Sequence, residues 1–272
     1  MTELVSVIIP SRLAKRSGSE RLWLERALSS VAGQSICAQA SLEIIVGLDY
    51  GQYLPSHKTP EGITLRSVAC EKGHKGQAAA LNAALADAHG EFIAILEDDD
   101  YWQERHLELA LTELGRFDFV SSSQLEVNEQ DEPVKINYFP TPSGWVMPHE
   151  LFMEIGFFDE TYRLHLDNEW LGRLNQKNKC RCHIVEATAP IDPNIATPWL
   201  WSELQSKSVL PAFLQRLPSG SRLVKSPDDV PNVIRTINPE GGMASTRQDD
   251  EARDRSDTEC WRLIEDYGCV SW

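Results

Sequence analysis

Short β-rich runs alternate with helical segments through the first hundred residues, and this alternation restricts the fold more than any other feature. Four apolar runs have the length and composition of buried strands: residues 4–10, 42–49, 63–70 and 92–97. Between the first two runs, Leu24, Leu28 and Val31 lie on one face of a predicted helix. The Ala-rich segment 76–91 predicts a second helix, which stops at Gly90. We therefore predict an α/β fold with a Rossmann-like, mostly parallel sheet that helices flank on both faces.

The second half of the chain has a different pattern, which predicts a smaller mixed sheet. Three β-rich segments predict short antiparallel strands: residues 117–127, 134–140 and 143–148. Residues 149–160 predict a helix that ends in a turn, and residues 167–178 predict another. Beyond about Pro190 the chain is rich in Pro and Trp. We expect the charged tract 245–257 to be mobile or to lie on the surface.

The charge of the chain argues against two classes of partner. The formal net charge is −15, with 41 acidic residues against 26 Lys and Arg. Nucleic-acid phosphates and anionic membranes both attract clustered Lys and Arg, so we expect no nucleic acid and no membrane surface as partner. An anionic ligand can still bind where a divalent cation bridges it to carboxylates.

The N-terminal stretch and the cysteines indicate a cytoplasmic protein. Basic residues follow the short apolar run of residues 4–9, whereas in a signal peptide they would precede it. That run is also far shorter than the roughly 20 apolar residues of a membrane-spanning helix. Six cysteines are scattered along the chain, and Cys180 and Cys182 form a single CxC without a second pair at zinc-finger spacing. We expect free thiols.

Four consecutive acids follow the fourth predicted strand and mark a candidate ligand site. Glu97, Asp98, Asp99 and Asp100 come directly after the apolar run. Adjacent carboxylates repel one another, so such a cluster is either a site for a cation or a solvated loop. In a parallel sheet, ligands bind beyond the carboxyl ends of the strands, where this cluster is expected. The sequence therefore predicts a functional site here.

The order of these motifs resembles the family 2 nucleotide-sugar glycosyltransferases, which have the GT-A fold. The resemblance runs from about Val5 to Leu174 and rests on six segments in the same order: SVIIP, LERALSSVAGQS, EIIVGLD, KGQAAALNAAL, GEFIAILEDDDYW and GFFDETYRLHLDNEWLGRL. It implies a GT-A domain over residues 1–190, with a nucleotide-binding half and an acceptor half that carries the smaller mixed sheet: residues 1–102 and 103–190. Residues 191–272 carry no resemblance, and we expect a C-terminal extension that shapes the acceptor side or an oligomer contact.

The resemblance implies a Mn²⁺ or Mg²⁺ site in the acidic cluster. Loss of a diphosphate develops negative charge, which a divalent ion held by one or two carboxylates and by diphosphate oxygens stabilises. The Asp-x-Asp of similar enzymes maps to Glu97-Asp98-Asp99, so Asp99 is the first choice as metal ligand. Glu97 takes the position near the ribose, although it is longer than the family's Asp. An alternative register uses Asp98 and Asp100, which could instead be solvated loop acids or N-caps.

Similar enzymes also suggest which residues bind the nucleotide. Pro10 and Ser11 are expected to form the lip over the base. Asp49 ends the second strand, where similar proteins carry an acid that accepts a hydrogen bond from the ring N–H of the base. The usual Asp-Asp-Gly-Ser is here Leu-Asp-Tyr-Gly, and a turn-forming Asp49 is the alternative.

Further donor contacts are expected from the start of the Ala-rich helix and from Trp145. Lys75 and Gly76 open that helix, whose N-terminal amides can approach nucleotide or phosphate, while a plain surface Lys75 is the alternative. Trp145 lies where similar enzymes contact the donor sugar or the acceptor, and core packing is its alternative role. Trp199 and Trp201 could stack on a sugar ring, although packing is the more ordinary role of such residues.

Asp167 is the residue that the resemblance implies as the base. An attacking acceptor hydroxyl must lose its proton. In similar inverting enzymes, the Asp of a Glu-Asp pair at the start of a helix takes it. Here Leu166 replaces the Glu, and Asp167 keeps its place. Asp167 is also a good N-cap for a helix from Asn168, and His165 could line the same site.

We thus expect a cytoplasmic, metal-dependent, inverting hexosyltransferase that moves a sugar from a nucleotide sugar, most simply a UDP-sugar, to a hydroxyl of a glycan or small-molecule acceptor. The fold also serves retaining transfer, and oligomerisation stays open. One alternative is a sugar nucleotidyltransferase, which would use a basic loop such as that with Arg12, Lys15 and Arg16. Another is a non-catalytic module that binds a nucleotide sugar or a glycan on a degenerate GT-A scaffold.

Overall fold

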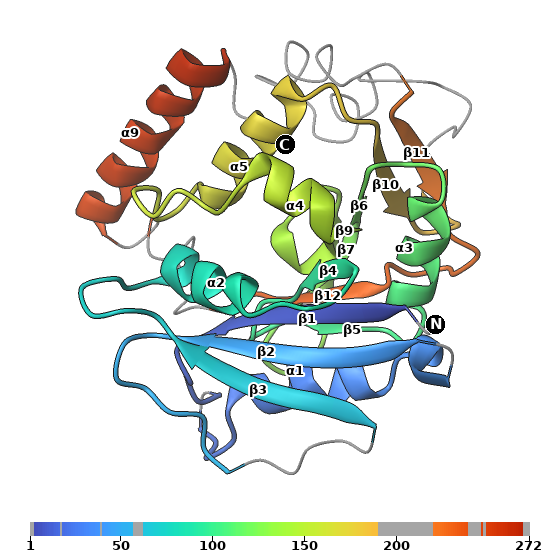
Figure 1. The fold of residues 1–272 in the computed structure, drawn as a ribbon, viewed down its shortest axis with the longest axis horizontal. Helices are drawn as coiled ribbons and strands as arrows, with labels where there is room; N and C mark the ends of the chain where they lie inside the picture. The colour runs from blue at the N-terminus through green and yellow to red at the C-terminus, as the bar shows by residue number, and fades with distance from the viewer. Residues whose placement is uncertain are drawn as a thin grey trace.

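The computed structural model describes residues 3–16, 18–38, 40–56, 62–189, 220–238, 246 and 249–268. These residues form an eight-stranded sheet in the order β11-β10-β6-β9-β4-β1-β2-β3 and a four-stranded sheet in the order β5-β12-β7-β8 (Figure 1). The larger sheet contains β1 (Leu4–Ser11), β2 (Ser41–Leu48), β3 (Ile63–Ala69), β4 (Phe92–Ile95), β6 (Phe119–Ser122), β9 (Val146–Pro148), β10 (Arg181–Val185) and β11 (Arg222–Lys225). The smaller sheet contains β5 (Tyr101–Trp102), β7 (Gln124–Val127), β8 (Pro133–Asn137) and β12 (Val233–Thr236).

The larger sheet is parallel except at β9. β1 pairs in parallel with β2 and β4, and β2 pairs in parallel with β3. β9 runs antiparallel to both of its neighbours, β4 and β6. The predicted α/β fold with a mostly parallel sheet is therefore confirmed. Because parallel strands end at the same edge, the residues that follow β1, β2 and β4 are brought together there.

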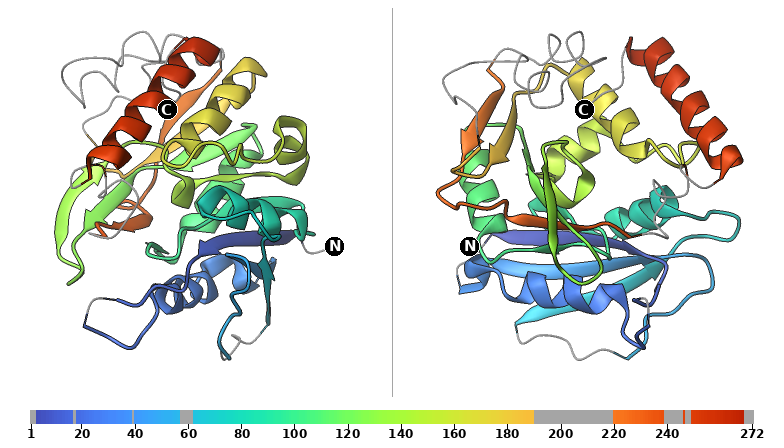
Figure 2. Two further views of the ribbon diagram at one scale, coloured as in Figure 1. Left: turned by 90° about the vertical axis from the view of Figure 1, so that its left-hand side faces the viewer. Right: turned by 180° about the vertical axis from the view of Figure 1, so that it is seen from behind.

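Helices cover both faces of the larger sheet (Figures 1 and 2). One face packs against α1 (Trp23–Ala32) and α3 (His106–Leu114), the other against α2 (Gln77–Ala86), α4 (His149–Ile155) and α5 (Leu166–Gln176). Side chains alternate along β1, so that Val7 and Ile9 belong to the first core and Ile8 to the second. Two short 3₁₀ segments are η1 (Ser35–Ala38) and η2 (Pro142–Gly144), and α9 (Asp250–Tyr267) lies beside α5.

The Ala-rich helix α2 lies very close to β2, and this closeness places its first turn at the functional edge. A Cβ atom added to Gly47 of β2 would collide with the carbonyl group of Ala80. Only a glycine on the strand and a small residue on the helix allow this approach. The N-terminus of α2 therefore meets the residues that follow β2.

Three predicted segments differ from the sequence-based expectation. Residues 143–148, predicted as one short strand, form the end of η2 and the strand β9 of the larger sheet. Residues 117–127 form two strands, because the chain passes from the larger sheet (β6) to the smaller sheet (β7) at Ser123. The backbone N–H of Ser123 there donates to Ile184 O at 2.8 Å. The described part of the charged tract 245–257 lies on the surface as expected, but residues 250–257 form the first turns of α9. Asp249 caps this helix by accepting the N–H of Glu251 at 3.0 Å.

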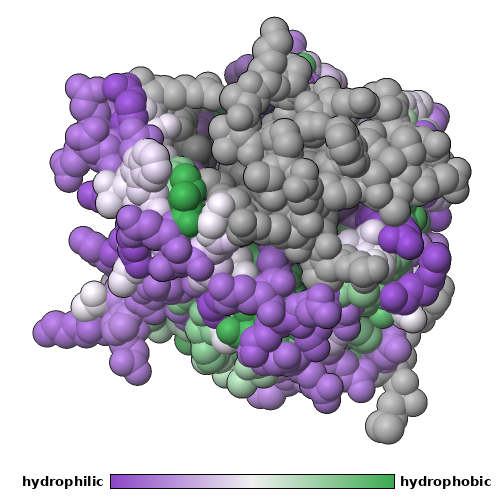
Figure 3. Space-filling model, turned by 90° about the horizontal axis from the view of Figure 1, so that it is seen from above, coloured by the Kyte–Doolittle hydropathy of each residue, from purple (hydrophilic) through white to green (hydrophobic). Residues whose placement is uncertain are grey.

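Residues beyond 190 belong to both sheets. β11 extends the larger sheet next to β10, and β12 lies between β5 and β7 in the smaller sheet. Trp199 and Trp201 lie outside the described residues. Hydrophilic side chains cover most of the described surface on the face seen in Figure 3.

Candidate active site

The four acids lie at the carboxyl end of β4, beside the end of β1. The N–H of Leu96 still donates to Ile8 O at 3.0 Å, and the chain then turns, with Asp100 N donating to Glu97 O at 3.1 Å. Glu97, Asp98 and Asp99 are half-buried, whereas Asp100 is only 1% exposed. The first three acids can therefore reach a ligand, and the fourth points into the protein.

Asp98 is tied to the end of β1. The hydroxyl of Ser11 donates to Asp98 Oδ2 at 2.5 Å, and the same Ser11 oxygen accepts the N–H of Leu13 at 3.0 Å. Burial and the neighbouring Asp99 carboxylate raise the pKa of Asp98 to about 7. Ser11 and Asp98 are thus brought together as the sequence predicted for one site, next to Pro10 in the last part of β1.

Asp100 has both carboxylate oxygens occupied by protein donors. The hydroxyl of Ser143 donates to Oδ2 at 2.6 Å, and the backbone N–H of Thr236 donates to Oδ1 at 2.9 Å. Burial and the charges of Asp99 and Glu97 raise the pKa of Asp100 well above its ordinary value. In this arrangement Asp100 joins η2 and β12 to the acidic turn, and at 1% exposure it is turned away from any ligand at the surface.

Among the described residues, the carboxylates of Glu97 and Asp99 each accept one side-chain hydrogen bond. The Gln77 amide donates to Glu97 Oε1, and the Asn238 amide donates to Asp99 Oδ2 at 3.0 Å. Arg26 of α1 donates to the backbone oxygen of Asp99 at 2.8 Å and so restrains the turn. Burial and the Asp99 charge raise the pKa of Glu97 to about 7. Carboxylates that are crowded enough to hold protons near neutral pH also favour a cation.

The protein carboxylates alone do not form a complete metal site. Within the described ranges, no three His, Cys, Asp or Glu side chains converge as a full ligand set. Mg²⁺ and its analogues commonly take one or two carboxylates and complete their coordination with phosphate oxygens and water. The half-buried Asp99 with its Glu97 neighbour therefore fits a metal that binds together with a diphosphate.

Arg235 of β12 is a site residue that the sequence reading missed. Its Nη1 donates to Glu126 Oε1 at 3.0 Å. Burial acts to lower the pKa of Arg235, but the charges of Asp100, Glu97 and Glu126 outweigh it and raise that pKa. The guanidinium thus compensates part of the negative charge of the site. The stretch around residue 235 matches no motif, so only the run of β-branched residues that contains this arginine could have drawn attention to it.

Asp167 lies in the first turn of α5 and reaches the same site. Its Oδ1 accepts the backbone N–H of Asn168 at 2.9 Å and the side-chain amide of Asn168 at 3.3 Å. Burial raises the pKa of Asp167, while the His165 and Arg235 charges act to lower it. The Asp167 charge in turn helps to raise the pKa of Glu97. Since α5 begins at Leu166 with His165 at the N-cap, Asp167 is not the N-cap that the sequence offered as its alternative role.

Asp49 and Gly76 are brought together at the end of β2. Asp49 Oδ1 accepts the backbone N–H of Gly76 at 2.8 Å. Gly76 has φ +88°, a conformation that other residues rarely adopt, and an added Cβ would also meet the Arg163 guanidinium at 2.5 Å. The Lys75 side chain is exposed, and its carbonyl oxygen accepts from Arg163. The first amide before α2 is therefore already bonded to Asp49.

Trp145 lies in the core. Its side chain is 0% exposed and its indole N–H donates to Pro140 O at 2.7 Å. Its ring packs against Phe119 and Trp170 at centroid distances of 5.4 and 5.3 Å. These contacts favour the packing role that the sequence left as its alternative.

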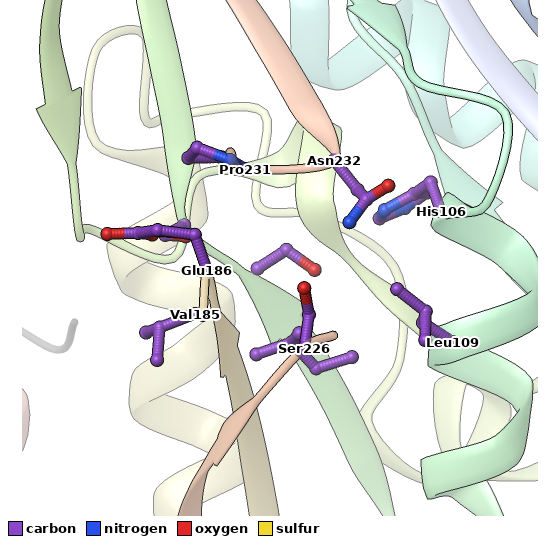
Figure 4. A pocket seen from close by; sticks show the side chains of 10 residues that line it. His106, Leu109, Val185, Glu186, Ser226, Pro231 and Asn232 are labelled. Carbon is purple, nitrogen blue, oxygen red and sulfur yellow. The ribbon is translucent and has the colours of Figure 1, made fainter. Parts of the chain in front are cut away.

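A small, partly open cavity lies at the carboxyl ends of β6 and β10 (Figure 4). His106, Ser226 and Asn232 point into it, and its volume of about 10 Å³ has room for a single water molecule. The Nε2 atom of His106 has no hydrogen-bond partner among the described residues. This cavity is too small for a sugar.

Comparison with known proteins places this chain in one family. The family model described as Glycosyl transferase family 2 matches residues 6–164, more than half of the chain. YwdF of Bacillus subtilis (strain 168), an uncharacterized glycosyltransferase, is 29% identical over 153 residues, which cover 48% of this chain and 55% of YwdF. The chain thus matches about half the length of that curated relative.

Two solved structures are similar in fold. The crystal structure of S. aureus TarS 1–349 in complex with UDP-GlcNAc has a TM-score of 0.54 at 15% identity, covering 90% of this chain and 61% of that one. Mannosyltransferase PcManGT from Pyrobaculum calidifontis, in complex with GDP-Man and Mn²⁺, has a TM-score of 0.50 at 16% identity, covering 91% and 61%. At such identities the likeness concerns the fold alone. As for membrane segments, the described helices are all too short or too polar to span a bilayer.

Proposed function

This chain belongs to glycosyl transferase family 2 and has the GT-A fold, and on that premise we propose that it transfers a sugar, with inversion, from a nucleotide sugar to an acceptor hydroxyl in the presence of Mn²⁺ or Mg²⁺. The donor that we propose is a UDP-sugar, as in the TarS complex. The GDP-Man of the PcManGT complex is the competing donor that any test must include.

One observation carries the proposal: carboxylates from distant parts of the chain meet at one sheet edge. Glu97 to Asp99 follow β4, Asp49 follows β2, and Asp167 lies in the first turn of α5, where its charge acts on Glu97. A single acidic loop can be stabilised by solvation alone. Carboxylates gathered from three elements repel one another, and a bound cation would offset that repulsion.

On the donor side we propose distinct roles for these residues. Asp99 holds the metal ion, and Glu97 and Asp98 face the ribose and the diphosphate. When bound, the ion stabilises the negative charge that develops on the leaving diphosphate. Asp100 holds the turn, because both of its oxygens are already bonded.

The nucleotide base is proposed to lie between the ends of β1 and β2. Pro10 and Ser11 form one side and Asp49 accepts from the base, while Lys75 and Gly76 stand at the opening of α2. Tyr53 in the loop after β2 is 84% exposed and is available for stacking on the base.

Asp167 is proposed as the base that takes the proton of the acceptor hydroxyl. Both hydrogen bonds from Asn168 end on Oδ1, so Oδ2 is the atom that we assign to the proton. A pKa raised by burial brings a carboxylate closer to the operating pH and so favours proton transfer. The acceptor half, residues 103–190, and the extension, residues 191–272, are proposed to shape the side from which the acceptor enters.

The basic loop after β1 does not favour a nucleotidyltransferase. Lys15 pairs with Glu20, and Arg16 pairs with Asp131 at 3.7 Å. A triphosphate would have to displace these carboxylates before it could bind the two cations.

A thermal-shift screen of UDP, GDP and their sugars, with and without Mn²⁺, tests the donor and the metal. A ligand at ~100 times its dissociation constant stabilises the native state by about 2.7 kcal/mol, on the order of 5–10 °C here. We expect this shift only with nucleotide and Mn²⁺ together. The anomeric configuration of the product, read by NMR, then separates inversion from retention. Binding without any hydrolysis or transfer would instead favour a non-catalytic binding module.

A further inference from the structure

Three successive backbone N–H groups before α5 donate to one buried carboxylate on the C-terminal helix. Arg163 N donates to Glu259 Oε1 at 2.8 Å, and Leu164 N and His165 N donate to Glu259 Oε2 at 2.9 Å each. The Glu259 residue is only 3% exposed. A buried carboxylate is costly unless it is fully hydrogen-bonded, so this contact is a specific one.

Glu259 bonds the segment that leads into α5. The N-cap residue His165 makes no side-chain cap bond of its own, and in the first turn Asp167 accepts the Asn168 N–H. Helix N-termini carry unsatisfied N–H groups and favour a negative charge. Glu259, on α9 and more than ninety residues further along the chain, accepts the N-cap N–H and the two N–H groups before it.

α9 is held on α5 by further contacts (Figures 1 and 2). The Tyr267 hydroxyl donates to Glu169 Oε1 at 2.9 Å, and its ring packs so closely that a Cβ on Gly172 would lie 2.7 Å from it. Ser256 Oγ lies 2.8 Å from His165 Nε2. The position of Glu259 is therefore set by several contacts along the helix.

The loop that Glu259 holds also touches the donor side. The Arg163 guanidinium donates to the carbonyl oxygen of Lys75, next to the Gly76 amide that Asp49 accepts. The loop ends at His165, two residues before Asp167. It is thus fixed between the opening of α2 and α9, and Asp167 follows directly from it.

We propose that Glu259 is a positioning residue, which sets the place of Asp167 relative to the donor through the backbone of residues 163–165. This inference rests on the proposed role of Asp167 as base. Displacement of a reacting group by about 1 Å, caused by a change far from the chemistry, can cost ~10²-fold in rate. Loss of the carboxylate should therefore lower kcat and leave donor binding unchanged.

The test compares Glu259→Gln with Glu265→Gln in the full chain. Both variants remove one negative charge from α9, but Glu265 is exposed whereas Glu259 is buried. For Glu259→Gln we expect kcat for donor hydrolysis or transfer to fall ~10–10²-fold, with the donor KM and the nucleotide affinity within about twofold of the parent. We expect Glu265→Gln to match the parent in all three.

Amide hydrogen exchange gives a readout that needs no turnover. In Glu259→Gln, the amides of residues 163–165 should exchange faster, while those of β1 and β2 stay protected. If kcat stays at the parental value, or if the loop amides keep their protection, Glu259 is not a positioning residue. If Glu259→Gln does not fold, Glu259→Asp keeps the charge on a shorter side chain. This variant must then show a lower kcat with an unchanged donor KM.

A parent that turns over no nucleotide sugar would contradict the proposed function. Hydrogen exchange would still decide, in that case, whether Glu259 holds the loop, so the two failures are distinguishable.

Discussion

The donor-side edge and the C-terminal segments differ in how they contribute to the site. The edge supplies acids that follow parallel strands, such as Asp49 and Asp99, from within the first hundred residues. The C-terminal segments supply contacts that hold these acids in place. Thr236 bonds Asp100 across 136 positions of the chain, and Asn238 bonds Asp99 across 139.

The residues proposed to bind ligand and the residues that hold them in place thus come from different parts of the chain. A residue that binds a ligand must present a free atom, so its change should remove function and leave the fold intact. A residue that holds such an atom is already bonded, so its change should alter function by degrees. Four predictions test this division.

The largest effect is expected at Asp167. The Asp167→Asn variant keeps the shape and an oxygen acceptor for the Asn168 N–H but cannot take a proton. Transfer should fall by ~10²–10⁴-fold, as for loss of a general base, while donor affinity stays parental. Steady-state rates and calorimetry measure the two quantities, and the melting temperature should stay within a few degrees. Near-parental transfer would place the base elsewhere.

Asp99→Ala should come next. It removes the proposed metal ligand, and the nucleotide affinity that depends on Mn²⁺ should drop at least ~10²-fold because charge-assisted contacts are lost. Calorimetric titration of nucleotide with Mn²⁺ measures this, and the metal-free affinity serves as the internal control. An unchanged affinity with Mn²⁺ would show that Asp99 does not hold the metal.

Asn238→Ala probes the same carboxylate from the C-terminal side. The variant loses the amide that donates to Asp99 Oδ2 at 3.0 Å. A hydrogen bond contributes about 0.5–1.5 kcal/mol, so the affinity for nucleotide with Mn²⁺ should fall only ~2–10-fold. A loss as large as that of Asp99→Ala would break the division between the two regions.

The smallest effect concerns His106, which lines the small cavity together with Asn232 of the C-terminal segments. Burial lowers the pKa of His106 to about 3, against roughly 6.5 in the unfolded chain. Below pH 6.5 the unfolded state therefore binds a proton at His106 that the folded state does not bind. The free energy of unfolding is highest above pH 6.5 and falls as the pH drops below it. Between pH 7.5 and 5.5 the parent should lose about 1.4 kcal/mol more than His106→Asn. Denaturant unfolding at the two pH values measures this, and equal losses would contradict it.

Much of the fold could be predicted from the sequence because hydrophobic periodicity, and with it the alternation of strands and helices along the chain, is a local property. Leu24, Leu28 and Val31 are buried on one face of α1 as expected, and the four early strands of the sheet occur where β-rich runs were found. The division of residues 117–127 into two strands could not be predicted. It depends on Ser123 pairing with Ile184, which is distant in sequence.

For the site, the sequence by itself determined which acids follow which strands. Parallel strands that end at one edge bring Ser11 and Asp98 together, whatever the rest of the chain does. The same pattern could not rank four adjacent acids, because it says nothing about their partners. Only the tertiary structure decided that Asp100 is enclosed by Ser143 and Thr236 while Asp99 remains accessible.

Only the tertiary structure also showed that Arg235 offsets negative charge at the site and that Glu259 bonds the loop before α5. Each acts through contacts with residues about a hundred positions away, and no local period or motif records such a contact. A strand end is a local property, which neighbouring residues specify through their own conformational preferences. The satisfaction of a buried charge is a property of the whole packed chain, because its partners come from whichever segments the fold brings beside it.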